Sequence, residues 1–243
     1  MKIGIITDIH NNLPALEAVL ETFSDCDQIV CCGDVIGIGP YPEETVQRLM
    51  RVPNLLSVRG NHDRYLLEGM PSEVPNDEHM ELSEMGMHRW EHARLSAESV
   101  AFLRAMPLQA EFEADGLRVA VQHYCMDEHN AYVHYTPNPT SADLDRMFAD
   151  VSADVILYGH DHAPSVRRTD RALYVNCGSL GCPGRERNVA RAGILEIRDG
   201  RAEFAPLAVR YDAARAVAEI DRLRYPSADE IKLYFFGISG AEK

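Results

Sequence analysis

The sequence is short of several features that mark particular classes of protein. None of its apolar stretches approaches the roughly 20 residues that a membrane-spanning helix needs. No charged and then apolar leader precedes the first apolar run, which begins at Lys2. No Ser/Gly-rich linker or internal repeat divides the 243 residues, a length that suffices for one α/β domain with a sizeable core. We therefore expect a single cytoplasmic domain, residues 1–243, with no membrane partner.

Positive charge is also scarce. The chain has 24 Lys and Arg residues against 38 Asp and Glu residues, which gives a formal net charge of −14. Tight binding to long nucleic acid depends on clustered Lys and Arg that displace counterions from phosphates. The balance therefore disfavours a nucleic-acid partner and favours a small substrate. The net charge is compatible with a homo-oligomer.

Cysteine is sparse and has no metal-binding spacing. None of the six cysteines stands in a C-x-x-C pattern, so a separate zinc site of that kind is not expected. Cys31 and Cys32 lie inside an apolar run and are typical of small buried hydrophobic residues. Cys125 and Cys177 are open to two interpretations, packing or lining a site.

The sequence does contain five polar clusters, each at the end of a short apolar run. The clusters hold five of the ten histidines, and they are Asp8-Ile9-His10, Gly33-Asp34, Gly60-Asn61-His62-Asp63, His123 and Gly159-His160-Asp161-His162. The runs before them are residues 2–7, 28–32, 55–58, 117–121 and 155–158. They are rich in Ile, Val and Leu, as buried strands are. If these strands lie side by side, the carboxyl ends of the strands bring all five clusters to one edge.

Apolar residues at helical spacing separate the early runs. The expected helices are residues 13–23, 42–50 and 141–148, with Asn11-Asn12 as a cap for the first. The order β-α-β-α-β predicts a parallel sheet. Between residues 64 and 106 the pattern changes to a charged insertion with expected helices at 81–95 and 96–106. Because the insertion leaves directly after Asp63, we expect it to roof the site.

Short strands dominate the last third of the chain. They are expected at residues 165–168, 172–176, 193–197 and 203–209, followed by a helix at 212–224. We assign these strands to an antiparallel second layer.

The cluster residues are typical metal ligands. Carboxylates mixed with imidazoles suit Mn²⁺, Fe, Zn²⁺ or Co²⁺ better than Mg²⁺ or Ca²⁺. The candidates are too numerous for one ion. Two ions about 3.5–4 Å apart that share one carboxylate would use them all. Asp34, single and central in the order, is the obvious bridge.

The five clusters together resemble the motifs of the calcineurin-like metallophosphoesterases: D-x-H, G-D, G-N-H-D, a lone His and G-H-x-H, in that order. The resemblance covers nearly the whole chain. It is closest to the bacterial and archaeal phosphodiesterase-like branch. The residues that carry the branch assignment are Gly37, Gly39 and Pro40 after Gly33-Asp34, the stretch Val58-Arg59 before Gly60, Asn176-Cys177-Gly178-Ser179, and Tyr211-Asp212.

The resemblance implies a fold and an activity. The fold is an α/β layered sandwich of two mixed β-sheets flanked by helices, with a helical cap insertion at about residues 64–110. The activity is the hydrolysis of small phosphodiesters or phosphomonoesters by in-line attack of a metal-bridging hydroxide. The cofactors are two divalent transition-metal ions, with manganese first and iron, zinc, cobalt or nickel as alternatives.

The resemblance also assigns roles by position. One metal is held by Asp8, His10, Asp34 and His162, and the other by Asp34, Asn61, His123 and His160. His62 binds no metal in this scheme and serves as the general acid, and Asp63 orients it.

Two departures from the family bear on the substrate. Serine/threonine phosphatases of the family read G-D-x-x-D-R-G, whereas Gly37 and Ile38 stand here in place of their Asp and Arg. The sequence therefore disfavours a protein phosphatase. The branch usually has Gly after the lone His, and the side chain of Tyr124 at that place is expected to narrow the pocket.

Other residues have competing interpretations. Arg185 and Arg187 form either a solvated loop or an arm that contacts phosphate. His88 and His92 lack the H-E-x-x-H spacing and are best explained as part of a surface helix. For the whole chain, the alternatives are a catalytically weak binding or scaffold module of the same fold, like the resembling retromer subunit, and a nuclease of the same family.

Overall fold

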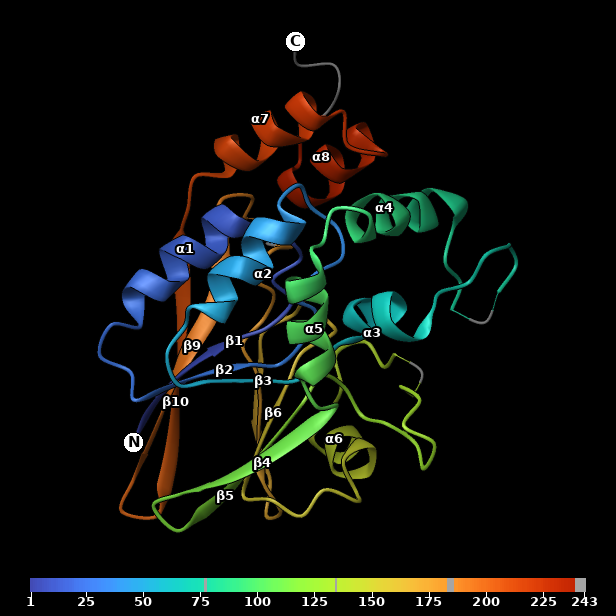
Figure 1. Ribbon diagram of the computed structural model, residues 1–243. Coiled ribbons are helices and arrows are strands. Elements are labelled where there is room, and N and C mark those ends of the chain that lie inside the picture. Colours follow the sequence, from blue (N-terminus) through green and yellow to red (C-terminus); the bar gives the residue numbers. More distant parts are fainter. Residues whose placement is uncertain (77, 134, 183–185, 239–243) are drawn as a thin grey trace.

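The protein is built from two five-stranded β-sheets that pack face to face, with helices on their outer sides (Figure 1). The computed structural model describes residues 1–76, 78–133, 135–182 and 186–238. The first sheet has the order β10-β9-β1-β2-β3 and the second has the order β4-β5-β6-β8-β7. The strands are β1 (Lys2–Ile6), β2 (Gln28–Cys31), β3 (Leu55–Ser57), β4 (Gln109–Ala114), β5 (Leu117–Gln122), β6 (Val155–Tyr158), β7 (Ser165–Arg168), β8 (Leu173–Asn176), β9 (Val189–Arg198) and β10 (Arg201–Arg210).

Both sheets are mixed, which confirms the fold class that the resemblance implied. Strands β1, β2 and β3 are parallel, and β9 joins them antiparallel to β1. Strands β5, β6 and β8 are parallel, with β4 and β7 antiparallel at the edges.

The arrangement expected from the strand pattern alone is wrong in two respects. The five apolar runs do not share one sheet, because β5 and β6 lie in the second sheet. The late strands do not form an antiparallel layer of their own, because β9 and β10 extend the first sheet while β8 pairs in parallel with β6. Strands buried on both faces carry no alternation that identifies their neighbours, so the partners are set by tertiary packing.

One core lies between the two sheets. Ile3 and Ile5 of β1 face Val121 of β5 and Leu157 of β6 across this layer. The alternate face of the first sheet packs against helices. There Phe23 lies directly on Gly4, since a Cβ on this glycine would stand 2.5 Å from the ring.

The helices cover the outer faces and one end of the sandwich (Figure 1). They are α1 (Leu13–Thr22), α2 (Pro42–Met50), α3 (Asn61–Glu68), α4 (Leu82–His92), α5 (Ala97–Ala105), α6 (Ser141–Met147), α7 (Ala213–Leu223) and α8 (Ala228–Phe236). The expected cap of the first helix is confirmed, because the side chain of Asn12 accepts a hydrogen bond from the backbone of Ala15. Helices α3 and α8 and strand β4 were not expected.

The segment between β3 and β4 does not lie over the site as a whole, although the sequence led us to expect this. Helix α5 packs beside α2, and Leu103 joins the core between the first sheet and its helices. Helix α3 follows β3 directly, and α4 packs against α3. The expected insertion is therefore not a single covering unit, because α5 belongs to the core. No helix in the described part of the chain combines the length and the apolar character needed to cross a bilayer.

Candidate metal centre

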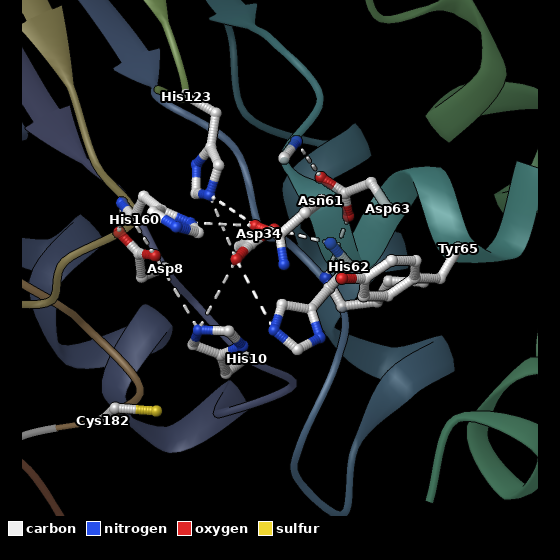
Figure 2. Close-up of polar contacts among 12 residues, drawn as sticks. Asp8, His10, Asp34, Asn61, His62, Asp63, Tyr65, His123, His160 and Cys182 are labelled. Atoms are coloured by element: carbon white, nitrogen blue, oxygen red, sulfur yellow. Dashed lines mark hydrogen bonds and ion pairs between the residues drawn. The ribbon is translucent and has the colours of Figure 1, made fainter. Parts of the chain in front are cut away.

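The five polar clusters converge although they come from two sheets. The loops after β1, β2 and β3 leave the first sheet, and those after β5 and β6 leave the second. Because the two sheets face each other, these loops meet at one end of the sandwich, where Figure 2 shows the side chains pointing toward a common centre.

Unusual backbone conformations aim the cluster side chains. Asp8, His10, Asp34, His160 and His162 all have positive φ, between 47° and 76°. Non-glycine residues seldom adopt this region and do so at a cost of order 1–3 kcal/mol each. Tertiary hydrogen bonds hold the loops in place. The backbone N–H of Asp8 donates to Gly33 O at 3.0 Å, and that of His10 donates to Asp34 O at 3.2 Å.

One group of ligand atoms forms around Asp8. His162 Nε2 lies 3.2 Å from Asp8 Oδ1 and 3.0 Å from His10 Nε2. His10 Nε2 is 3.8 Å from Asp8 Oδ1 and 3.9 Å from Asp34 Oδ2.

A second group lies on the other side of Asp34. His123 Nε2 is 3.2 Å from Asp34 Oδ2 and 3.1 Å from Asn61 Oδ1. His160 Nδ1 is also 3.1 Å from Asn61 Oδ1. The structure thus brings together all seven residues that the sequence suggested as ligands.

Asp34 stands between the two groups. Its Oδ1 accepts the backbone N–H of His62 at 3.0 Å, and its Oδ2 faces His123 and His10. Glycine is required beside it, since a Cβ on Gly60 would lie 2.0 Å from Asp34 Oδ1. The carboxylate is therefore fixed between the two groups.

The donor set fits divalent transition metals. Metal–ligand bonds of about 2.0–2.2 Å place neighbouring ligand atoms about 3–3.5 Å apart, and most of the contacts above have this spacing. Burial alone would raise the pKa of Asp8 and of Asp34, but the facing histidines outweigh burial and hold both pKa values below the usual range. Burial lowers the pKa of His10 and of His160 to about 4, which keeps both imidazoles neutral as ligands must be.

The raised pKa of His123 indicates that the site attracts positive charge. Burial opposes its protonation, but Asp34 and Asp8 outweigh burial and raise the pKa of His123 to about 9. A divalent cation would satisfy the same carboxylates while leaving this imidazole neutral. The buried carboxylates thus favour a cation at this centre.

His62 lies at the edge of the centre, next to Asp34 and His10. Its Nε2 is 3.9 Å from Asp34 Oδ2, and its ring meets that of His10 edge to face at a centroid distance of 5.0 Å. The side chain is 11% exposed. Its ligand atom lies within 4.8 Å of those of His10 and Asp34, so the assignment of His62 as a proton donor and not a ligand stays a prediction.

The contacts of Asp63 differ from the expected ones. Its buried carboxylate accepts hydrogen bonds from the backbone N–H groups of Val35, Ile36 and Gly60. Burial and the nearby Asp34 raise its pKa to about 7, against the effect of those N–H groups. Within the described residues Asp63 makes no hydrogen bond to the His62 ring. Asp63 therefore fixes the loop after Asp34 and does not itself orient that ring.

Two residues that contact the site were assigned elsewhere or overlooked. His88 is buried, not on a surface helix as expected, and its Nε2 lies 3.3 Å from His62 Nδ1. Cys182 offers its sulfur within 4.8 Å of ligand atoms of His10 and His162. Cys125 and Cys177 belong instead to apolar cores. The sequence around Cys182 has no local metal-binding spacing that reveals its position.

The remaining expectations concern the two arginines that were suggested to contact phosphate and the tyrosine that was suggested to narrow the pocket. Arg185 lies outside the described residues. The side chain of Arg187 packs on Gly237 at the end of α8 and contacts none of the candidate ligands. Tyr124 is fully buried behind His160, with ring centroids 4.5 Å apart, so the expectation that it narrows the pocket is wrong.

An open cavity of about 560 Å³ adjoins the centre. Its lining includes Asn61 and His160, and the other residues that shape it are Arg64, Tyr65, Glu68, Glu78, Glu84, Tyr132 and Tyr135. Its size falls within the roughly 300–1,000 Å³ of sites for small molecules. A larger cavity of about 870 Å³ lies near the amino ends of β5 and β8 and contains none of the five clusters.

Comparison with known proteins gives consistent results. Residues 1–200 match the model of the calcineurin-like phosphoesterase superfamily domain. The chain is similar to the uncharacterized protein MJ0912 of Methanocaldococcus jannaschii, with 30% identity over 92% of this chain and 93% of that protein. It is also similar to the phosphodiesterase YfcE of Escherichia coli, with 25% identity over 81% of this chain and 88% of YfcE. A crystal structure of a metallophosphoesterase from Sphaerobacter thermophilus has a TM-score of 0.75 and 26% identity, and the match covers 98% of this chain and 99% of that one.

Proposed function

This chain belongs to the calcineurin-like phosphoesterase superfamily, and on that premise we propose that it is a dimetal-dependent phosphoesterase that hydrolyses small phosphodiesters or phosphomonoesters. The similarity to bacterial and archaeal proteins confirms the phosphodiesterase-like branch, and the family and its phosphodiesterase relative support a hydrolase. The family also implies divalent metal ions. We propose manganese as the native metal.

One observation carries the proposal. Two groups of ligand atoms lie on either side of Asp34, with His62 at their edge. Asp8, His10 and His162 would hold one ion with Asp34, and the second would be held by Asn61, His123, His160 and the shared Asp34. When bound, two such ions polarise phosphoryl oxygens and lower the pKa of water toward neutrality.

The chain itself supplies orientation and a proton donor. The neutral imidazoles of His10 and His160 and the ionised Asp8 and Asp34 are ready as ligands without loss of a proton. His123 and His162, whose pKa values are raised, would each release a proton to a bound cation. The Gly60 contact fixes Asp34, and the Asp63 carboxylate fixes the loop that follows it. His62 Nε2 faces the place where the leaving oxygen of a bound ester would lie. It is the proposed general acid.

The described residues favour a catalyst over the alternatives. A scaffold module of this fold has no need of a complete ligand set, whereas every candidate ligand is present and oriented here. A nuclease that binds long DNA needs a basic surface, and the net charge is −14. Cytoplasmic location and a homo-oligomer stay predictions.

The substrate preference is testable with three phosphate esters. We expect turnover of an aryl phosphodiester and an aryl phosphomonoester to exceed turnover of a phosphopeptide by at least about tenfold. The physical reason is the cavity of about 560 Å³ together with Gly37 and Ile38 in place of an acidic and a basic side chain. Steady-state kinetics with saturating Mn²⁺ measure the preference, and faster hydrolysis of the phosphopeptide would refute it.

We also propose that the chain acts as one domain in which α4 and the connection from α3 form a cap over the cavity. Tyr65 of α3 donates to Glu78 Oε2 at 3.0 Å, and both residues line the cavity. The cap therefore limits how large a bound ester can be.

Shortening the connection tests the cap. Replacement of residues 69–80 by a short Gly/Ser linker keeps α3 with its ligand Asn61 and leaves α5 in the core. We expect kcat/KM for a bulky diaryl phosphodiester to rise relative to that for a methyl aryl diester, since the cavity wall is removed. Metal content of two ions per chain serves as the control. An unchanged ratio in a variant with full metal content contradicts the cap.

A further inference from the structure

Behind His62 lies a chain of buried polar groups that the proposed mechanism has not used. His88 Nε2 is 3.3 Å from His62 Nδ1, and His88 Nδ1 is 2.6 Å from Glu91 Oε1. The other oxygen of Glu91 accepts from Asn11 Nδ2 at 2.6 Å. His88 and Glu91 have fully buried side chains, and both come from helix α4, not from a strand end.

The backbone leaves room for this contact. A Cβ on Gly37 would stand 2.5 Å from His62 Nδ1, and the φ of Gly37 is +91°. A side chain at this position would displace the His62 ring or cover the nitrogen that faces His88. The loop after Asp34 therefore keeps His62 Nδ1 open to α4.

On the basis of the proposed function, we propose that His88, which Glu91 holds in place, is a positioning residue for His62. It sets the tautomer of His62, and it resupplies the proton that His62 gives to the leaving group. In the resting enzyme His88 Nδ1–H donates to Glu91, and His88 Nε2–H donates to His62 Nδ1. A His62 ring that accepts at Nδ1 must carry its own proton on Nε2. That nitrogen is the one that faces the metal centre.

The proton transfers balance. As the phosphorus–oxygen bond breaks, the leaving oxygen takes the proton of His62 Nε2. His62 Nδ1 takes the proton of His88 Nε2, and the positive charge of the His88 imidazolium is lost as the alkoxide becomes an alcohol. His88 ends neutral with its Nδ1–H still on Glu91. The Glu91 carboxylate keeps its negative charge and still accepts the hydrogen bond from His88 Nδ1.

The electrostatics of α4 favour a protonated His88. Burial alone would lower its pKa, but Glu84 and Glu91 outweigh burial and raise the pKa to about 9. The other polar groups that face this imidazole are His62 and Tyr65 from α3 and His92 from α4, whose ring centroids lie 5.0–5.7 Å away. The proton therefore resides on His88, and the 3.3 Å contact between His88 Nε2 and His62 Nδ1 is the path by which it reaches His62.

The test uses aryl phosphate esters whose leaving groups range from nitrophenol to unsubstituted phenol. In His88→Gln we expect two bound metals, a loss of less than about threefold on the nitrophenyl ester, and a loss of about 10–100-fold on the phenyl ester, within the range of general acid catalysis. Glu91→Gln should shift the leaving-group dependence in the same direction by a smaller factor. Arg89→Gln is the matched control, because Arg89 lies next to His88 on α4 but has an exposed side chain; it should keep the wild-type dependence.

A double-mutant cycle separates the relay from the rest of the function. If His88 acts through His62, His88→Gln should cause no further loss in a His62→Ala background, whereas independent roles would give additive losses. Additive losses, equal losses on all esters, or loss of a metal ion in His88→Gln would overturn the proposal. Turnover of the nitrophenyl ester by the wild type tests the phosphoesterase function itself, so failure of one does not imply failure of the other.

Discussion

Asp34→Ala is expected to abolish binding of both metal ions and to lower phosphoesterase activity by at least about 10³-fold. A two-metal site supplies several kcal/mol of transition-state stabilisation, and each 1.4 kcal/mol corresponds to about tenfold in rate. Asp34 faces His10 in one group and His123 in the other, so its loss removes a ligand from both. Elemental analysis of protein titrated with Mn²⁺, together with steady-state kinetics, measures both effects.

Two further variants control for this result. Asp8→Ala should weaken mainly one ion, because Asp8 faces His162 and His10. Asp161→Asn should retain both ions, because Asp161 pairs with Asn176 although it stands between two candidate ligands in the chain. A wild-type plateau at one ion per chain, or an Asp34→Ala variant that loses a single ion, would contradict the bridge.

His62→Ala is expected to retain both metals and to lose activity in proportion to the basicity of the leaving oxygen. General acid catalysis contributes about 10²–10⁴-fold when the leaving group needs a proton. Alkyl and ribose esters should lose activity within that range, while nitrophenyl esters should lose less than about tenfold because nitrophenolate departs without protonation. His62→Asn should give the same pattern.

The structure changes the companion prediction for Asp63. A carboxylate that orients His62 would, when replaced by Asn, show the same leaving-group dependence in weaker form. Asp63 instead accepts from three backbone N–H groups around Asp34. We therefore expect Asp63→Asn to lower activity on all esters by a similar factor. Loss of a metal in His62→Ala, or equal slowing of both ester types, would show that His62 is a ligand or a substrate clamp.

The convergence of the candidate ligands could be predicted because each of them follows a strand that the sequence itself specifies. Short runs rich in Ile, Val and Leu form β1, β2, β3, β5 and β6 within one or two residues of the expected bounds. The Asp, Asn and His residues that follow these strands therefore lie at the carboxyl ends of the strands, which is the same end of the fold. Composition and spacing were sufficient here, since the local pattern determines each strand end.

The partners of the strands and the surroundings of His62 required the tertiary structure. The apolar runs do not encode that β5 and β6 lie in the opposite sheet, or that β9 pairs with β1, because strands buried on both faces look alike in sequence. His88 stands on a charged helix that resembles a surface helix, and Cys182 has no motif around it.

By itself, the sequence determined the five strands that precede the polar clusters and the residue types typical of metal ligands at their carboxyl ends, because these depend on local periodicity and chemistry. Only the tertiary structure decided that two facing sheets share the centre, that Asp63 holds a loop, and that His88 and Glu91 lie behind His62. These contacts join residues distant in the chain. Their formation depends on how α4 packs over the strand ends, which no local pattern specifies.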